Sequence, residues 1–304
     1  MSDDEIAYPP DHLNPPRPSH TLAGRAAIVT GAGSQSSGIG NGRATAILLA
    51  EAGARVVCAD INLDWANKTV SMITSEFGPG VAIAVQADVT KSADCKRIVN
   101  EALKHFGRLD ILVNNVGVGG PKGTAVDVEP EQWARGLEIN VTSMMLMAKY
   151  AVPAMEKNKR GTVSGRGAIV NIASVAGLIG GTPTLLYPTS KGAILNMTRA
   201  MAAHHAPAGI RVNSVCPGMV YTPMMYSRGM PNEAREARRK RSLLHTEGNG
   251  WDVGAAVRFL ASDQARWITG VFLPVDAGAT AAIPQTGDLA RGAVFSAPDT
   301  SSKL

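Results

Sequence analysis

Short apolar runs rich in β-branched residues alternate along the chain with longer segments whose apolar residues recur every three or four positions. The short runs are typical of buried strands, and the three-to-four step is typical of helices with one buried face. The predicted strands are residues 26–30, 54–60, 81–86, 110–114, 168–172, 210–215 and 271–275. The predicted helices are residues 43–52, 63–77, 92–106, 129–155, 187–205 and 251–261.

This alternation of strands and helices predicts an α/β fold. Strands separated by helices of this length form βαβ units, which build a parallel sheet with helices on both faces. We therefore expect a doubly wound, seven-stranded parallel sheet in a single domain that spans residues 22–283. Residues 1–21 contain five prolines and few apolar residues, and they are expected to form an extended arm. Residues 284–304 form a polar C-terminal tail.

The composition is that of a globular protein, with 45% hydrophobic and 18% charged residues. The formal net charge of +5 is diffuse, except for a basic run at residues 235–241. Only 5% of residues are aromatic, so the stacking surface of a nucleic-acid-binding protein is missing. We interpret the basic run as a solvated helix face rather than an anion-binding patch, and we expect no nucleic-acid partner.

The sequence contains no run of about 18 apolar residues, which is the length needed to span a bilayer. Its first residues are acidic where a secretory signal is basic. Cys58, Cys95 and Cys216 lack metal-site or redox-motif spacing, so they are expected to be reduced thiols, and we expect no metal. These features predict a soluble intracellular protein with no membrane partner. The final Ser302-Lys303-Leu304 matches a peroxisomal signal, which predicts a peroxisomal location in a eukaryote and a cytoplasmic one otherwise.

A glycine-rich segment, TGAGSQSSGIG at residues 30–40, separates the first predicted strand from the first predicted helix. Glycines let a backbone approach a pyrophosphate, and a helix N-terminus offers N–H groups and partial positive charge. Asp60 ends the second predicted strand, where a carboxylate accepts hydrogen bonds from the adenosine ribose and repels a 2′-phosphate. Together, the glycine-rich segment and Asp60 predict NAD rather than NADP as the cofactor. Taken alone, each feature is also compatible with an ordinary turn.

Tyr187 and Lys191 lie four positions apart on a predicted helix and therefore share one face. An ammonium near the phenol favours the phenolate, so we expect the pKa of Tyr187 to lie below its reference of about 10. Such a tyrosine can exchange a proton with an alcohol or carbonyl oxygen near neutral pH. The pair therefore predicts a general acid/base.

Further motifs occur in a fixed order: Asp88-Val89, the run NNVG at residues 114–117, Asn140, Ser174, the run YPTSK at residues 187–191, Pro217-Gly218 and Thr222. With the glycine-rich segment, this order resembles the classical short-chain dehydrogenase/reductase family over about residues 22–279. The resemblance implies a Rossmann-type fold and hydride transfer between a nicotinamide cofactor and a small-molecule alcohol or ketone. It also implies a homo-oligomer, either a tetramer or a dimer, and a substrate lid at about residues 223–250.

The same resemblance implies roles for individual residues. Ser174 would hydrogen-bond the substrate oxygen, Lys191 would also bind the nicotinamide ribose, and Asn140 would hold a water of the proton relay. Taken alone, Ser174 fits a turn and Asn140 a helix kink equally well. The implied cofactor-binding residues are Gly31, Ser34, Gly38, Ile39, Gly40, Asp60, Asp88, Val89, Asn115, Gly117, Tyr187, Lys191, Pro217, Val220 and Thr222.

The glycine-rich segment departs from the family pattern, because six residues separate Gly31 from Gly38 where the family has three. The insertion leaves open which of Ser34, Ser36 and Ser37 meets the phosphates. Three hypotheses on function follow. The leading one is an NAD-dependent dehydrogenase or ketoreductase for a secondary alcohol or ketone. The others are a reductase of β-ketoacyl thioesters of the coenzyme A type, and a catalytically idle NAD-binding scaffold.

Overall fold

The computed structural model describes residues 16–35, 37–161, 165–227 and 229–283. Most of the proline-rich arm, Ser36, the tail at 284–304 and the C-terminal tripeptide lie outside the described residues. The expectations for those segments therefore remain predictions.

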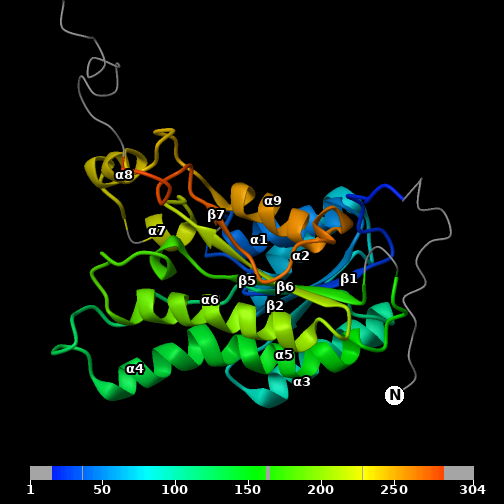
Figure 1. Ribbon diagram of the computed structural model, residues 1–304. Coiled ribbons are helices and arrows are strands. Elements are labelled where there is room, and N and C mark those ends of the chain that lie inside the picture. Colours follow the sequence, from blue (N-terminus) through cyan, green and yellow to red (C-terminus); the bar gives the residue numbers. More distant parts are fainter. Residues whose placement is uncertain (1–15, 36, 162–164, 228, 284–304) are drawn as a thin grey trace, which may run out of the picture.

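Seven parallel strands form one sheet in the order β3-β2-β1-β4-β5-β6-β7 (Figure 1). The strand order reverses between β1 and β4, as it does in a doubly wound Rossmann-type fold. All seven strands consist mainly of buried or half-buried apolar residues, as strands covered on both faces require. The predicted fold class is confirmed. The strands are β1 Ala26–Thr30, β2 Arg55–Asp60, β3 Ala82–Gln86, β4 Ile111–Asn114, β5 Gly167–Ile172, β6 Ile210–Pro217 and β7 Phe272–Val275.

Helices cover both faces of the sheet (Figure 1). On one face, α1 (Asn41–Glu51), α2 (Leu63–Phe77) and α9 (Gly250–Ala261) pack against the strands and enclose one hydrophobic core. On the other face, α3 (Ser92–Phe106), α5 (Ser143–Met155) and α6 (Leu186–His205) enclose a second core. The short helices α7 (Pro223–Tyr226) and α8 (Asn232–Arg239) lie between β6 and α9, in the predicted lid.

The single helix predicted for residues 129–155 is wrong. The segment forms α4 (Pro130–Leu137), a π-helical turn at Glu138–Thr142 and then α5. A π turn contains one more residue than an α turn, and it typically marks a functional position. Here it carries Asn140, whose side chain is fully buried. The pattern of apolar residues continues through the break, which is why periodicity alone did not reveal it.

No helix of the described part is both long and apolar enough to cross a membrane.

Candidate active site

The glycine-rich segment leads from the carboxyl end of β1 into α1. No side chain caps the N-terminus of α1 at Gly40, and the first turn contains no acidic residue. By contrast, α9 begins with a complete capping box formed by Asn249 and Asp252. In addition, Asn41 Oδ1 is buried without a hydrogen-bond partner among the described residues. A helix start with uncompensated N–H groups is suited to bind an anion such as a pyrophosphate.

Gly42 makes the closest backbone approach in this segment, and the sequence analysis did not single it out. A Cβ atom at Gly42 would lie 2.0 Å from Gly31 O and 2.5 Å from Asn115 Nδ2. In a dinucleotide-binding segment, the last position must be glycine because the helix and the strand pack this closely there. By contrast, a Cβ at Gly40 would meet only Ser34 Oγ, at 3.0 Å, and Ser34 Cβ. Counting back from the helix, instead of forward from β1, would have pointed to Gly42.

Arg43 is a second residue that the sequence analysis missed. Its side chain is fully buried under the glycine-rich segment. The guanidinium donates to Gly38 O at 2.6 Å, to Ser34 O at 3.3 Å and to Thr69 Oγ1 at 3.0 Å. Burial lowers the pKa of Arg43, and the carboxylate of Asp60 opposes that effect. Arg43 therefore holds the carbonyl groups of the segment inward, which leaves its N–H groups to face outward.

Asp60 ends β2 beside the same segment and is only 8% exposed. Its carboxylate accepts hydrogen bonds from Gly33 N at 2.9 Å and from Asn62 N at 3.0 Å. Burial raises the pKa of Asp60, and these backbone hydrogen bonds lower it in part. The structure thus places the carboxylate at the tip of β2, next to Gly33.

Asn115 and Gly117 follow β4, the strand on the other side of β1. The Asn115 side chain donates to Thr30 O at 3.2 Å and to Gly31 O at 2.9 Å, so it ties the end of β4 to the glycine-rich segment. A Cβ at Gly117 would lie 3.2 Å from Lys191 Nζ and 3.6 Å from Asn140 Oδ1. Gly117 therefore lies between the segment that suits a pyrophosphate and the side chains from α6 and the π turn.

Asn140 is held through its whole amide group. Its Oδ1 accepts from Val118 N at 2.8 Å, and its Nδ2 donates to Val118 O at 2.9 Å and to Ser190 Oγ at 2.9 Å. The π turn is what directs this side chain inward. The π turn lies where the sequence analysis considered a helix kink at Asn140, and it brings Asn140 Oδ1, like Lys191 Nζ, within 4 Å of the position that a Cβ at Gly117 would take.

Tyr187 and Ser174 meet where β5 and α6 approach each other. Ser174 follows β5 and begins a short turn, in which its Oγ accepts from Ala176 N at 3.1 Å. Burial raises the pKa of Tyr187, and a hydrogen bond with the Ser174 side chain lowers it only in part. The expected lowering by Lys191 is therefore wrong for this structure. Lys191 Nζ lies 5.7 Å from the centre of the Tyr187 ring and donates instead to Ile172 O at 2.8 Å.

Lys191 is 4% exposed, and burial lowers its pKa to about 8. A weakly basic amine at this position can exchange protons near neutral pH. Ser174, Tyr187, Lys191 and Asn140 thus gather at the carboxyl edge of the sheet, next to Gly117 and the start of α1. A phenol, a hydroxyl and an amine in this arrangement can protonate or deprotonate an oxygen atom placed above Gly117.

Comparison with known proteins identifies the family. A family model described as enoyl-(acyl carrier protein) reductase matches residues 31–280. The chain is 37% identical over 254 residues to meso-2,3-butanediol dehydrogenase of Serratia marcescens, which covers 84% of this chain and 94% of that protein. The chain belongs to the short-chain dehydrogenase/reductase family.

Solved structures of short-chain dehydrogenases/reductases agree in fold. One from Burkholderia xenovorans has a TM-score of 0.78 and 39% identity, and it covers 86% of this chain and 98% of its own. A 7α-hydroxysteroid dehydrogenase complexed with NADH and 7-oxo glycochenodeoxycholic acid has a TM-score of 0.76 and 34% identity, with coverage of 85% and 95%. The chain is therefore a nicotinamide-dependent oxidoreductase.

The remaining residues expected to bind cofactor in this short-chain dehydrogenase/reductase lie at the same edge of the sheet. Asp88 follows β3, and its carboxylate accepts from the backbone N and the Oγ1 of Thr90. Pro217 ends β6, Val220 pairs with Gly248 in an isolated bridge, and Thr222 is buried before α7. Val89 is a core residue, and its side chain packs in the interior of the protein.

The predicted lid of this family member touches the inserted loop. Ser227 Oγ and Gln35 Oε1 are 2.6 Å apart, and a Cβ at Gly38 would collide with Tyr226 Oη. The basic run lies largely on α8, which has no buried residue, as a solvated helix face requires. Arg235 pairs with Glu247 and Arg239 with Glu236. Among the described residues, no group of three or more His, Cys, Asp or Glu could hold a metal ion.

The pH dependence of stability tests the buried state of Lys191 in this short-chain dehydrogenase/reductase. A folded pKa of about 8 against 10.5 in the unfolded chain means that the unfolded state binds more protons between these values. Wild-type stability should therefore rise relative to Lys191→Met, by roughly 3 kcal/mol between pH 7 and 10.5. Urea unfolding across this range measures the difference. Lys68→Met, at an exposed position of α2, is the control and should give no such trend.

Proposed function

We propose that this protein transfers a hydride between NAD(H) and a secondary alcohol or ketone, with Tyr187 as general acid/base. The observation that carries the proposal is the convergence of Ser174, Tyr187 and Lys191 beside Gly117. This group lies next to the start of α1, whose uncapped N–H groups suit an anion. The residues present fit a dinucleotide, because glycines provide the close approach and the N-terminus of α1 is uncapped. The nicotinamide supplies or accepts the hydride.

The chain's own residues handle the proton. Because burial raises the pKa of Tyr187, the phenol is protonated at neutral pH and can donate its O–H to the carbonyl oxygen of a ketone. Ser174, hydrogen-bonded to the phenol, orients the same oxygen. In the oxidative direction, Tyr187 accepts the alcohol proton, and a cationic Lys191 stabilises the phenolate that forms.

Lys191 and Asn140 extend this path away from the substrate. Lys191 Nζ lies near Asn140, and its pKa of about 8 allows it to take up or release a proton near neutral pH. Asn140 is held by the backbone of Val118 and by the hydroxyl of Ser190, which together fix its position. We assign Asn140 the positioning of a water that connects Lys191 to solvent.

NAD is the proposed cofactor because Asp60 places a carboxylate at the tip of β2. A 2′-phosphate brought to this carboxylate would meet a like charge, which costs several kcal/mol at close range. Asp60→Asn keeps the shape of the side chain and removes its charge. We expect the preference for NADH over NADPH, measured as the ratio of kcat/KM values, to fall by about tenfold or more. Asp64→Asn, at an exposed position of α2, should leave the ratio unchanged.

The direct test of the proposal is turnover of a panel of cyclic, aliphatic and thioester carbonyls with NADH and with NADPH. Reduction of simple ketones with NADH preferred would support it. Preference for NADPH would contradict the role of Asp60 while leaving the proton path intact. Binding of NADH without any turnover would favour the third hypothesis, a catalytically idle scaffold, against which the complete set of side chains argues.

A thioester reductase is the second candidate, because the description of the matching family model names an acyl carrier protein substrate. In this reading, the basic run of α8 would meet the phosphates of a coenzyme A-type carrier. The ion pairs of Arg235 and Arg239 with Glu247 and Glu236 argue against it, since they leave less charge for such a partner. Equal kcat/KM for a ketone and its thioester, without dependence on salt, would exclude this candidate.

We also propose a homo-oligomer, either a tetramer or a dimer. Exposed apolar side chains near β7 support it, since Trp267 is 92% exposed and Phe259 and Val271 are more than one-third exposed. Elution as a monomer in gel filtration at micromolar concentration would contradict this. The peroxisomal location remains a proposal for a eukaryotic source, tested by whether deletion of Ser302-Lys303-Leu304 changes the location of a tagged chain.

A further inference from the structure

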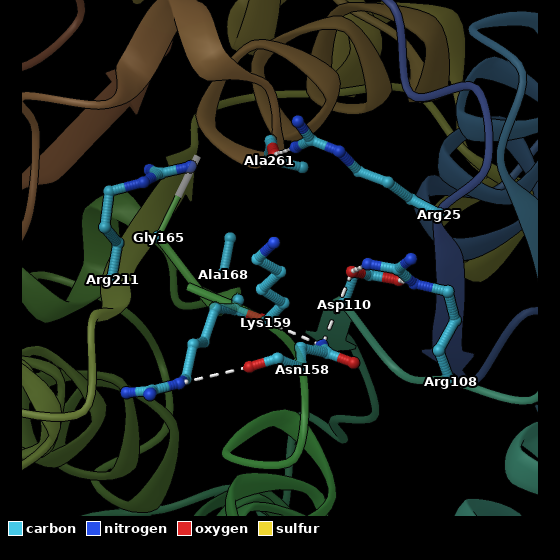
Figure 2. A pocket seen from close by; sticks show the side chains of 11 residues that line it. Arg25, Arg108, Asp110, Asn158, Lys159, Gly165, Ala168, Arg211 and Ala261 are labelled. Carbon is cyan, nitrogen blue, oxygen red and sulfur yellow. Dashed lines mark hydrogen bonds and ion pairs between the residues drawn. The ribbon is translucent and has the colours of Figure 1, made fainter. Parts of the chain in front are cut away.

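A cavity of about 50 Å³ lies at the amino edge of the sheet, opposite the edge that carries Tyr187 and the glycine-rich segment (Figure 2). Its charged lining is mostly basic. Asp110 is the one carboxylate among the lining residues, and the cationic ones are Arg25, Arg108, Lys159, Arg166 and Arg211. None of these residues belongs to the proposed active site.

The arginines gather there because each of four central strands has an arginine at or just before its start. Arg25 and Arg166 directly precede β1 and β5, Arg108 lies three residues before the start of β4, and Arg211 is the second residue of β6. Since all these strands are parallel, their amino ends meet at one edge of the sheet. Part of this arrangement is structural: Arg211 donates to Leu260 O at 2.8 Å and to Ser262 O at 3.1 Å, at the C-terminal end of α9. Cations are favourable at such helix ends.

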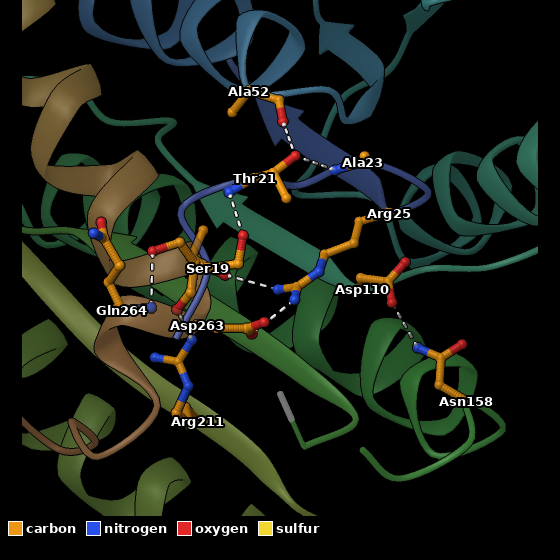
Figure 3. A network of polar contacts seen from close by, with 12 residues as sticks. Ser19, Thr21, Ala23, Arg25, Ala52, Asp110, Asn158, Arg211, Asp263 and Gln264 are labelled. Carbon is orange, nitrogen blue, oxygen red and sulfur yellow. Dashed lines mark hydrogen bonds and ion pairs between the residues drawn. The ribbon is translucent and has the colours of Figure 1, made fainter. Parts of the chain in front are cut away.

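Two of the cations have carboxylate partners. Arg25 pairs with Asp263 at 2.7 Å, and Arg108 pairs with both oxygens of Asp110, at 2.7 and 2.8 Å. Figure 3 shows Arg25 beside Asp263, with Asn158 directed at Asp110. Asn158 also donates to Leu109 O and Arg166 O, so the loop that carries Lys159 is anchored to the floor of the cavity.

Two further cations have no carboxylate partner within hydrogen-bond distance. Arg211 hydrogen-bonds only to carbonyl oxygens, and its Nε is buried without an acceptor among the described residues. Burial lowers the pKa of Arg211 to about 10, and the nearby charge of Arg25 adds to the effect while Asp263 opposes it. Lys159, whose side chain is directed into the cavity in Figure 2, makes no ion pair or hydrogen bond in the described part of the chain. The cavity therefore has more positively charged side chains than the nearby carboxylates can pair with.

We propose that this cavity binds a small phosphate-type oxyanion between Lys159 and Arg211. Both Nη atoms of Arg211 already donate to carbonyl oxygens, so Arg211 contributes its positive charge, and the ammonium of Lys159 can donate hydrogen bonds to a phosphate oxygen. A water needs about 10–15 Å³ of such a volume, so a cavity of about 50 Å³ has room for a few waters or one small tetrahedral ion. The ligand is either free orthophosphate or a phosphomonoester whose organic part extends to solvent.

The test is the binding of inorganic phosphate to the NADH-saturated protein, measured by titration calorimetry and by the shift in Tm. Saturation with NADH keeps phosphate out of the dinucleotide site, and sodium chloride at equal ionic strength corrects for screening. We expect Lys159→Gln and Arg211→Gln each to weaken phosphate binding by about tenfold. Lys157→Gln, an exposed lysine of the same loop that does not line the cavity, is the matched control and should leave it unchanged.

Lys159→Gln is decisive, because Arg211→Gln also removes hydrogen bonds to the end of α9 and can unfold the protein. Methyl phosphate forms a second arm of the experiment. Binding of both anions assigns the cavity to phosphomonoesters as well, and binding of orthophosphate alone assigns it to the free ion. No saturable binding at millimolar phosphate, or equal binding by wild type and Lys159→Gln, would overturn the proposal.

Discussion

Tyr187→Phe is expected to lower kcat for ketone reduction by about 10²–10⁴-fold while NADH binding is retained. The substitution removes only the phenolic oxygen, which is hydrogen-bonded to Ser174 and which we assign as the proton donor. Packing of the ring against Lys191 and its neighbours remains, so stability should change little. Steady-state turnover and a fluorescence titration with NADH measure the two quantities separately.

Tyr150→Phe is the matched control. Tyr150 lies on α5, and its hydroxyl is 2.6 Å from Ser92 Oγ at the start of α3, so it contacts none of the residues that we assign to the active site through this hydrogen bond. Its loss should leave kcat within about twofold of wild type. If Tyr187→Phe kept more than a tenth of wild-type kcat, another group would have to supply the proton. Loss of NADH binding in the variant would instead indicate a structural role for the phenol.

Gly42→Ala is expected to destabilise the protein by about 1–3 kcal/mol and to weaken NADH binding at the same time. The added Cβ would lie 2.0 Å from Gly31 O and 2.5 Å from Asn115 Nδ2, and because Gly31 O belongs to the backbone, the glycine-rich segment must move. Such a shift also moves the N–H groups that we assign to the pyrophosphate. Urea unfolding and a titration with NADH measure both effects.

Gly192→Ala provides the comparison on another helix. Gly192 lies within α6, and a Cβ there would meet only Gly177 O, at 3.6 Å, an ordinary contact. We expect this variant to gain up to about 1 kcal/mol in stability from helix propensity. An equal response of the two variants would show that the close approach at Gly42 has no special role.

Periodicity determined the fold class and the order of the elements in this protein. The predicted strand at 26–30 coincides with β1, and the predicted helices at 63–77 and 92–106 coincide with α2 and α3. These elements are regular and bury one clear face or core, so local pattern and tertiary packing agree. The motif order likewise identified the family that the comparisons show.

Tertiary structure decided the features that depend on distances between elements. The π turn that directs Asn140 inward lies in an unbroken helical pattern, and the contacts of Asn140 with Val118 and Ser190 become visible only in the folded chain. Gly42 preceded the predicted helix and Arg43 looked like an ordinary residue of its first turn. In the structure, α1 packs so closely on Gly31 that Gly42 must lack a side chain, and Arg43 is buried.

The sequence alone also did not reveal the electrostatics of the active site or of the amino edge of the sheet. Four-residue spacing brings Lys191 near Tyr187, yet desolvation outweighs that proximity and raises the pKa of the phenol. The arginines at the amino ends of the strands, Arg25, Arg108, Arg166 and Arg211, are 83, 58 and 45 residues apart in turn along the chain, and only the parallel sheet brings their charges together. Local spacing thus determined which groups are available, and burial and long-range packing decided their charge states and partners.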